Sequence, residues 1–176
     1  RIAGGGAVSH DPVGEIPYTI LGPLGEFPSD VIESYRLICG HIIEAFNMLG
    51  VESSFQPIND ILVDGRKISG NAQARKRGVL LQHGTILYRV SVETMFTLLT
   101  VSEEKVSDKL IRSVKKRVTS LSEIKPVAFE ELAAALEKAF SEGREVELGE
   151  YTAEELARAR QLAAEKYSTE EWVAMR

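Results

Sequence analysis

The fold class is set by residues 61–89, which read ILVDGRKISGNAQARKRGVLLQHGTILYR. The apolar run Ile61-Leu62-Val63 leads into Asp64-Gly65, a dipeptide that strongly favours a two-residue hairpin turn. Two longer strands are then predicted, one over residues 67–75 and one over residues 79–89. We therefore expect a block of paired strands in the middle of the chain.

Helical periodicity is clearest just before this block. Ser29 or Asp30 can cap the first turn of a helix, and Gly50 can end it. The apolar positions between these limits alternate at spacings of four and three, which places them on one helix face. They are Val31, Tyr35, Ile38, Ile42, Ala45 and Leu49. One long amphipathic helix is therefore predicted.

Shorter elements are predicted on both sides. Ala7-Val8 and residues 16–21 are short strand candidates. The later candidates are helices over 92–99, 107–121, 129–140 and 153–167, a strand over 144–148, and a last helical turn after Ser168. Thr152 with Glu155 and Ser168 with Glu171 match the capping box at the last two helix starts.

This order of elements indicates an α+β fold with a mixed or antiparallel sheet flanked by helices. A regular alternation of strands and helices is not present. The glycine-rich loop near the N-terminus does not open a helix, so a Rossmann fold is excluded.

Composition is that of an ordinary globular protein. The 176 residues, 44% hydrophobic and 27% charged, fit a single domain over residues 1–176. A net charge of −5 favours neither nucleic acid nor an anionic membrane, so neither is an expected partner. The basic run at residues 112–117 is interpreted as the solvated face of a helix. One cysteine, no apolar run of about 18 residues and no signal peptide make a cytoplasmic protein the expectation.

The first candidate site is the loop Gly4-Gly5-Gly6. Backbone N–H groups without neighbouring Cβ atoms can cradle an anion such as a phosphate. Arg1 can add a bidentate contact to the same anion. The alternative is a flexible turn, but the titratable pair His10-Asp11 at the end of the loop is more than a turn requires.

The second candidate is Lys67, at the start of a predicted strand. Its ammonium is a compact charge suited to a phosphate or a carboxylate oxygen. The alternative is a solvated lysine that protects an edge strand. Gly70 and Ala72 on the same strand are small, which indicates close approach of a ligand or of another backbone, or else a bulge.

Three further positions have competing interpretations. Asp60 can bind a hydroxyl or a metal ion, whereas Asn59 can simply cap a turn. His83, inside an otherwise apolar strand, is by default a buried core histidine. Cys39 lies beside the apolar stripe of the long helix and is interpreted as a small buried hydrophobe.

Five segments in chain order carry a more specific signal. They read RIAGGGAVSHD at 1–11, NDILVDGRKISGNA at 59–72, QHGTIL at 82–87, RVTSL at 117–121 and YSTEEW at 167–172. Together they resemble the motifs of the lipoate–protein ligase family. The resemblance runs through nearly the whole chain.

The resemblance implies the α+β fold of biotin and lipoyl ligases, related to class II aminoacyl-tRNA synthetase cores. Such enzymes use ATP and Mg²⁺ to convert lipoate to an enzyme-bound lipoyl-AMP. They then transfer the lipoyl group to a lysine of an acceptor domain, in the E2 component of 2-oxoacid dehydrogenases or in the glycine cleavage H protein.

By position, the resemblance also assigns site residues. Lys67 would be the catalytic contact to the lipoyl carboxylate and the α-phosphate. The residues expected around the nucleotide and adenylate are Arg1, Gly4, Gly5, Gly6, Ala7, Val8, Ser9, His10, Asn59, Asp60, Gly70, Ala72 and His83. No metal ligands are assigned.

The chain departs from the family pattern in several ways. Ser9 replaces the usual aromatic residue, and Pro17 interrupts the strand after the loop. The family's first strands and helix before the glycine loop are expected to be missing, as is the C-terminal accessory domain that some members carry and others obtain as a separate chain.

Three rival functions remain open. A related octanoyltransferase moves an acyl group from acyl carrier protein through a cysteine thioester, but its cysteine falls near Ser53-Ser54-Phe55, where this chain has serine. A non-catalytic accessory subunit that binds the lipoyl adenylate is the second rival. Biotin ligation is the third, and the motifs follow the lipoyl branch instead.

Overall fold

The structure is a computed structural model that divides into two compact units, residues 1–142 and 143–176. The residues that it describes are 3–4, 8, 10–91, 94–95 and 116–174. Each unit is described by itself.

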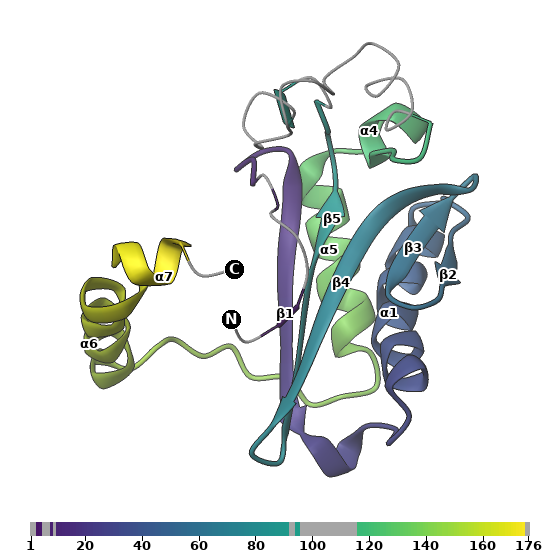
Figure 1. Ribbon diagram of the computed structural model, residues 1–176. Coiled ribbons are helices and arrows are strands. Elements are labelled where there is room, and N and C mark those ends of the chain that lie inside the picture. The colour runs from purple at the N-terminus through teal and green to yellow at the C-terminus, as the bar shows by residue number, and fades with distance from the viewer. Residues whose placement is uncertain (1–2, 5–7, 9, 92–93, 96–115, 175–176) are drawn as a thin grey trace. The chain divides into compact units, whose positions relative to one another are not determined.

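The first unit is built on one five-stranded sheet with strand order β1-β5-β4-β3-β2 (Figure 1). The strands are β1 (Glu15–Pro23), β2 (Ser54–Gln56), β3 (Asp60–Val63), β4 (Arg66–Lys76) and β5 (Val79–Leu87). Every neighbouring pair is antiparallel, so the α+β prediction is confirmed and the sheet is antiparallel rather than mixed.

Two tight turns set the register of this sheet. Asp64 and Gly65 have φ of 49° and 72°, and Arg77 and Gly78 have φ of 55° and 77°. Positive φ at both central residues is the mark of the type I′ turn, whose twist matches that of paired strands. The predicted Asp-Gly hairpin is confirmed, and Arg77-Gly78 forms a second hairpin of the same kind.

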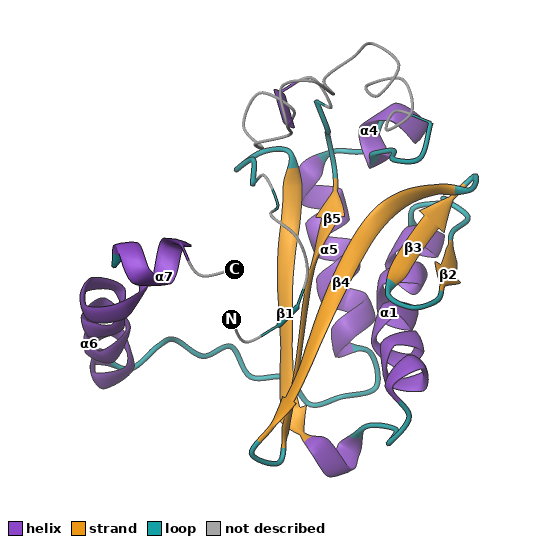
Figure 2. Ribbon diagram, in the orientation of Figure 1, coloured by secondary structure: helices purple, strands orange, loops and turns teal. Residues whose placement is uncertain are grey.

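Helices α1 (Val31–Met48) and α5 (Phe129–Ser141) pack on one face of the sheet (Figure 2). The predicted cap is confirmed: the Asp30 carboxylate accepts from Glu33 N at 2.9 Å. Gly50, with φ of 66°, follows the end of α1. The core between helices and sheet is formed by Cys39, Ile42, Ala45, Phe46, Val51, Ile61, Val63, Ile68, Ile86, Leu121, Val127, Leu132, Ala135, Leu136 and Ala139.

Some predicted elements are absent or shifted. Val8 is not in a strand, and Ala7 lies outside the described residues, as do most of residues 92–99 and all of 107–115. The prediction of a helix over 107–121 is wrong for residues 116–120, which form a turn followed by extended chain. Their backbone pairs with Lys67 instead, and the short helix α4 (Leu121–Ile124) begins after them.

The second unit contains α6 (Ala153–Leu162), a π-helical turn (Ala163–Tyr167) and α7 (Glu170–Ala174). The Thr152 capping box is confirmed, since Glu155 N donates to Thr152 Oγ1 at 3.2 Å. The predicted cap at Ser168 is wrong: Thr169 Oγ1 accepts from Trp172 N instead, at 3.3 Å.

Two further findings concern the chain as far as the structure describes it. Residues 144–148 form no strand and are exposed, because no strand lies in this unit for them to pair with. No helix in the described ranges is long and apolar enough to cross a membrane.

Candidate active site

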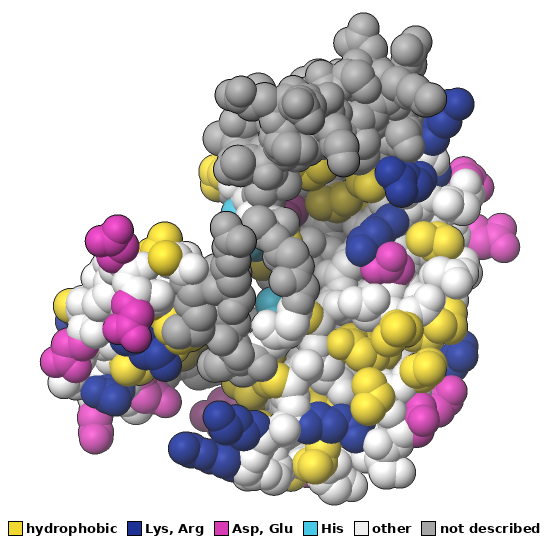
Figure 3. Space-filling model, viewed as in Figure 1, with side chains coloured by type: hydrophobic (Ala, Val, Ile, Leu, Met, Phe, Trp, Pro, Cys, Tyr) yellow, Lys and Arg dark blue, Asp and Glu magenta, His cyan; other side chains and the backbone are white. Residues whose placement is uncertain are grey.

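A pocket of about 960 Å³ lies over the sheet face opposite the helices and extends to Tyr35 of α1. Alternation along β5 shows this: Gln82, Gly84 and Ile86 are buried toward the helices, while His83 and Thr85 point the other way. In the space-filling view, histidine side chains are visible in the hollow in front of the sheet (Figure 3). The described residues around the pocket include Gly4, Val8, His10, Glu15, Tyr35, Asn59, Lys67, Gly70, Ala72, His83, Thr85, Leu87, Arg89, Met95 and Val118.

The structure brings most of the predicted site residues together. Those that line this one pocket are Gly4, Val8, His10, Asn59, Lys67, Gly70, Ala72 and His83. Asp60 joins them through an ion pair to Lys67. The predicted residues that lie outside the described part of the chain are Arg1, Gly5, Gly6, Ala7 and Ser9. The interpretation of His83 as a core histidine is wrong, because its side chain is exposed on the pocket face.

Lys67 is held by its backbone as well as its side chain. Its N–H donates to Arg117 O at 2.7 Å, and its carbonyl accepts from Thr119 N at 2.9 Å. Between Ile61 and Leu62 of β3 the register shifts by one residue, so that Ile68 forms a bulge on β4. A bulge re-aims the neighbouring side chains, and Lys67 here lies across the pocket wall.

The side chain of Lys67 lies over Gly70. Its Nζ is 2.5 Å from Asp60 Oδ1, and both side chains remain partly exposed, 39% and 30%. A Cβ added at Gly70 would lie 2.7 Å from Lys67 Cε and 2.8 Å from Nζ. Glycine at this position therefore leaves room for the lysine side chain, and the bulge of this strand lies at Ile68 instead.

We expect Gly70→Ala to displace the Lys67 ammonium, because the new methyl group would occupy its present position. Misplacing a reacting group by about 1 Å can lower turnover by roughly 10²-fold, and a loss of this size is expected here. Turnover of purified protein measures it. Gly25→Ala is the matched control, since a Cβ there meets nothing within 4 Å; equal activity of the two variants would contradict the assigned role of Gly70.

The sequence analysis did not identify Asn71, whose side chain lies on the helix-facing side of the same strands. Its Nδ2 donates to Asn59 O at 2.8 Å, its backbone N–H donates to the same oxygen at 3.1 Å, and the Asn59 amide donates back to Asn71 O. Tyr18 OH donates to Asn71 Oδ1 at 2.6 Å, and Gln82 Nε2 donates to Tyr18 OH at 2.8 Å. These hydrogen bonds hold Asn59 and therefore fix the start of β3 at Asp60.

Cys39 lies inside this polar network, away from the pocket. Its side chain is fully buried, with Asn71 Nδ2 at 3.5 Å and Gln82 Nε2 at 3.8 Å from Sγ. Burial raises the pKa of the Cys39 thiol to about 12. The prediction of a small buried residue is confirmed, and such a thiol is a poor nucleophile.

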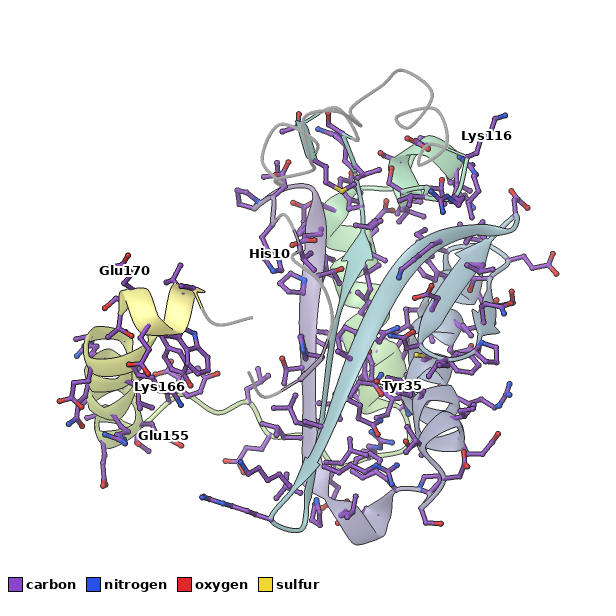
Figure 4. All side chains as sticks on the ribbon, viewed as in Figure 1. His10, Tyr35, Lys116, Glu155, Lys166 and Glu170 are labelled. Atoms are coloured by element: carbon purple, nitrogen blue, oxygen red, sulfur yellow. The ribbon has the colours of Figure 1, made fainter. Side chains whose placement is uncertain are left out.

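Two titratable groups that line the pocket, His10 and Glu15, form a pair. His10 Nδ1 contacts Glu15 Oε1 at the start of β1, where Figure 4 shows the imidazole beside the strand. The Glu15 side chain is only 6% exposed, whereas that of His10 is 65% exposed. Tyr35 of α1 also lines the pocket, and burial raises the pKa of its phenol, which is therefore neutral.

A known protein family matches the chain over almost the whole of its first unit. The model of the lipoyl protein ligase A/B catalytic domain matches residues 1–141. The chain belongs to this family. Octanoyltransferase LipM of Brevibacillus brevis is 31% identical over 201 aligned positions, which cover 98% of this chain and 72% of that protein.

Two solved lipoyl ligase structures are also similar. The bi-partite lipoate protein ligase of Thermoplasma acidophilum, described with its E2 lipoyl domain, has a TM-score of 0.87 and 30% identity, covering 98% of this chain and 68% of that one. A lipoate-protein ligase A bound with ATP has a TM-score of 0.80 and 26% identity, with 98% and 69% covered. The predicted resemblance and the biotin/lipoyl ligase fold are confirmed.

The resemblance to lipoyl ligases implies Mg²⁺, so the acidic side chains near the pocket are possible ligands for this ion. Within the described ranges, no group of three or more His, Cys, Asp or Glu side chains is placed to hold a metal ion. Mg²⁺ commonly keeps several waters and binds one or two carboxylates together with substrate phosphates. Asp60, beside Lys67, is a carboxylate that fits such a contact.

Proposed function

We propose that this chain is the catalytic domain of an ATP-dependent lipoate–protein ligase. It activates lipoate to lipoyl-AMP and transfers the lipoyl group to a lysine of a lipoyl acceptor domain. The observation that carries the proposal is the Lys67 ammonium in the pocket wall, in a chain whose one cysteine is buried elsewhere.

The chemistry of adenylation explains why a lysine supports this reaction. The lipoate carboxylate and the α-phosphate repel each other as they approach, and charge develops on the phosphate in the transition state. A fixed ammonium near both groups cancels that repulsion. Lys67 can provide it, and Mg²⁺ carried with the nucleotide would neutralise the departing pyrophosphate.

The pocket also offers apolar surface for an acyl chain. Leu87, Met95 and Val118 line it together with the ring of Tyr35, next to the polar groups. A few polar groups among apolar walls are typical of small-molecule sites. Ala72, opposite His83 in the sheet register, adds little bulk to the floor.

The alternative is an octanoyltransferase, and the similarity to LipM favours it. Transfer through a thioester needs an accessible thiol whose pKa allows a thiolate near neutral pH. Cys39 is fully buried, with a pKa of about 12. The chain has serine at Ser53 and Ser54, near the position where the resemblance to octanoyltransferases implies their cysteine. Both observations support the ligase over the transferase.

We expect Cys39→Ser to keep turnover within about threefold, because the donors from Asn71 and Gln82 already point at the Sγ position and can bind a hydroxyl. The native thiol should also resist iodoacetamide at pH 8, far below its pKa, and react once the protein is unfolded. Loss of activity in Cys39→Ser, with the fold intact by circular dichroism, would favour the thioester mechanism.

The ligase reaction is tested by lipoate-dependent exchange of pyrophosphate into ATP, followed by lipoylation of an E2 lipoyl domain or H protein. The assay is run with and without a separate accessory chain. Acyl transfer from acyl carrier protein without ATP would overturn the proposal. Binding of lipoyl-AMP with no turnover under every condition would identify a non-catalytic accessory subunit.

A further inference from the structure

The pair of His10 and Glu15 has no part in the adenylation chemistry assigned to Lys67. The Glu15 carboxylate is buried at the start of β1 and contacts Nδ1 of His10, which leaves Nε2 as the ring nitrogen without that partner. A buried carboxylate that holds one imidazole nitrogen fixes the tautomer and stabilises the imidazolium that forms when the other nitrogen takes a proton.

The second half of the proposed reaction needs such a base. An acceptor lysine with an ordinary pKa of about 10.4 is almost entirely protonated at pH 7, and an ammonium has no lone pair with which to attack. The incoming lysine must therefore lose a proton before it can attack the acyl-adenylate.

Other pocket groups are less suited to accept this proton. Lys67 is a cation paired with Asp60, and the Asp11 carboxylate accepts from Val13 N at 3.0 Å. The guanidinium of Arg89 has hydrogen-bond donors and no acceptor. His83 has an exposed imidazole, but within the described residues no carboxylate contacts it.

We propose that His10, held by Glu15, is the general base that deprotonates the acceptor lysine in the transfer step. This inference rests on the proposed ligase function. The lysine Nζ gives one proton to His10 Nε2, and its lone pair forms a bond to the acyl carbon. The bond from that carbon to the phosphate oxygen breaks, AMP leaves with the electron pair, and the second amine proton passes to solvent.

Supplying lipoyl-AMP directly isolates this step. Transfer from bound lipoyl-AMP is measured to two nucleophiles, the lysine of a lipoyl domain and hydroxylamine, which is already neutral at pH 7. Each rate is corrected for reaction without enzyme. A variant that binds the adenylate poorly is slow with both nucleophiles, whereas a variant that lacks the base is slow with lysine alone.

We expect His10→Gln to lower the ratio of the lysine rate to the hydroxylamine rate by about 10²-fold, the usual contribution of a general base. Glu15→Gln, which keeps an acceptor but removes the charge, should lower the ratio by about tenfold. Imidazole added to His10→Ala should restore much of the lysine rate.

His83→Gln is the matched control, a second pocket histidine expected to affect both rates alike. An unchanged ratio in His10→Gln, or a fall in His83→Gln instead, overturns the role of His10. A wild-type protein that neither forms lipoyl-AMP nor transfers from it contradicts the ligase proposal itself, so the two failures are distinguishable.

Discussion

Lys67→Ala is expected to lower the rate of lipoyl-AMP formation by about 10³-fold, the upper range for removing one charged contact from a developing anion. The ammonium lies beside Asp60 at the pocket wall, and its backbone is held on both sides, so its position is fixed before substrate binds. The rate is measured by pyrophosphate exchange and by direct detection of lipoyl-AMP.

The fold should survive this substitution. Both partners of the ion pair are partly exposed, so its loss should cost at most about 1 kcal/mol of unfolding free energy. Lys76→Ala, at the exposed end of the same strand, is the matched control and should retain full activity. A folded Lys67→Ala protein that turns over at the wild-type rate would remove the basis of the proposed function.

Local sequence signals predicted the frame of the fold well. The Asp64-Gly65 hairpin and the capped helix from Asp30 depend on interactions within a few residues, and both form as expected. Residues 116–120 show the opposite case, because their conformation depends on backbone bonds to Lys67, far away in the chain. No local pattern contains that information, so a helix was predicted there.

The face of β5 was harder to predict for a different reason. Its helix-facing positions are Leu80, Gln82, Gly84 and Ile86, of which two are not hydrophobic. With the alternation broken in this way, His83 seemed to lie in an apolar strand and was interpreted as buried. The polar network around Asn71 explains why Gln82 is tolerated inside. Its hydrogen bonds join Gln82 to β1 and β4, which no local pattern along β5 contains.

The same network makes Gly84→Ala the most damaging small substitution that we expect for stability. A Cβ at Gly84 would lie 2.2 Å from Asn71 Oδ1, 2.7 Å from Gly70 O and 2.9 Å from Tyr18 Cε1. Overpacking of this kind commonly costs 1–3 kcal/mol, and the backbone contact puts the expected loss at about 3 kcal/mol. Urea denaturation measures it, with Gly25→Ala as a control expected to be near neutral.

A double-mutant cycle with Asn71→Ala tests the cause. Alone, Asn71→Ala should cost about 2 kcal/mol, because the Tyr18 hydroxyl and the Asn59 carbonyl lose a buried partner. Once Asn71 Oδ1 is absent, the Cβ at position 84 loses its shortest contact, so the double mutant should be more stable than the sum predicts by about 1 kcal/mol. Additive losses would show instead that the Gly70 carbonyl dominates. In that case the strain at Gly84 would be transmitted to the site by the backbone of Gly70, which lies beneath Lys67. The hydrogen bonds between Asn71 and Asn59 would not transmit it.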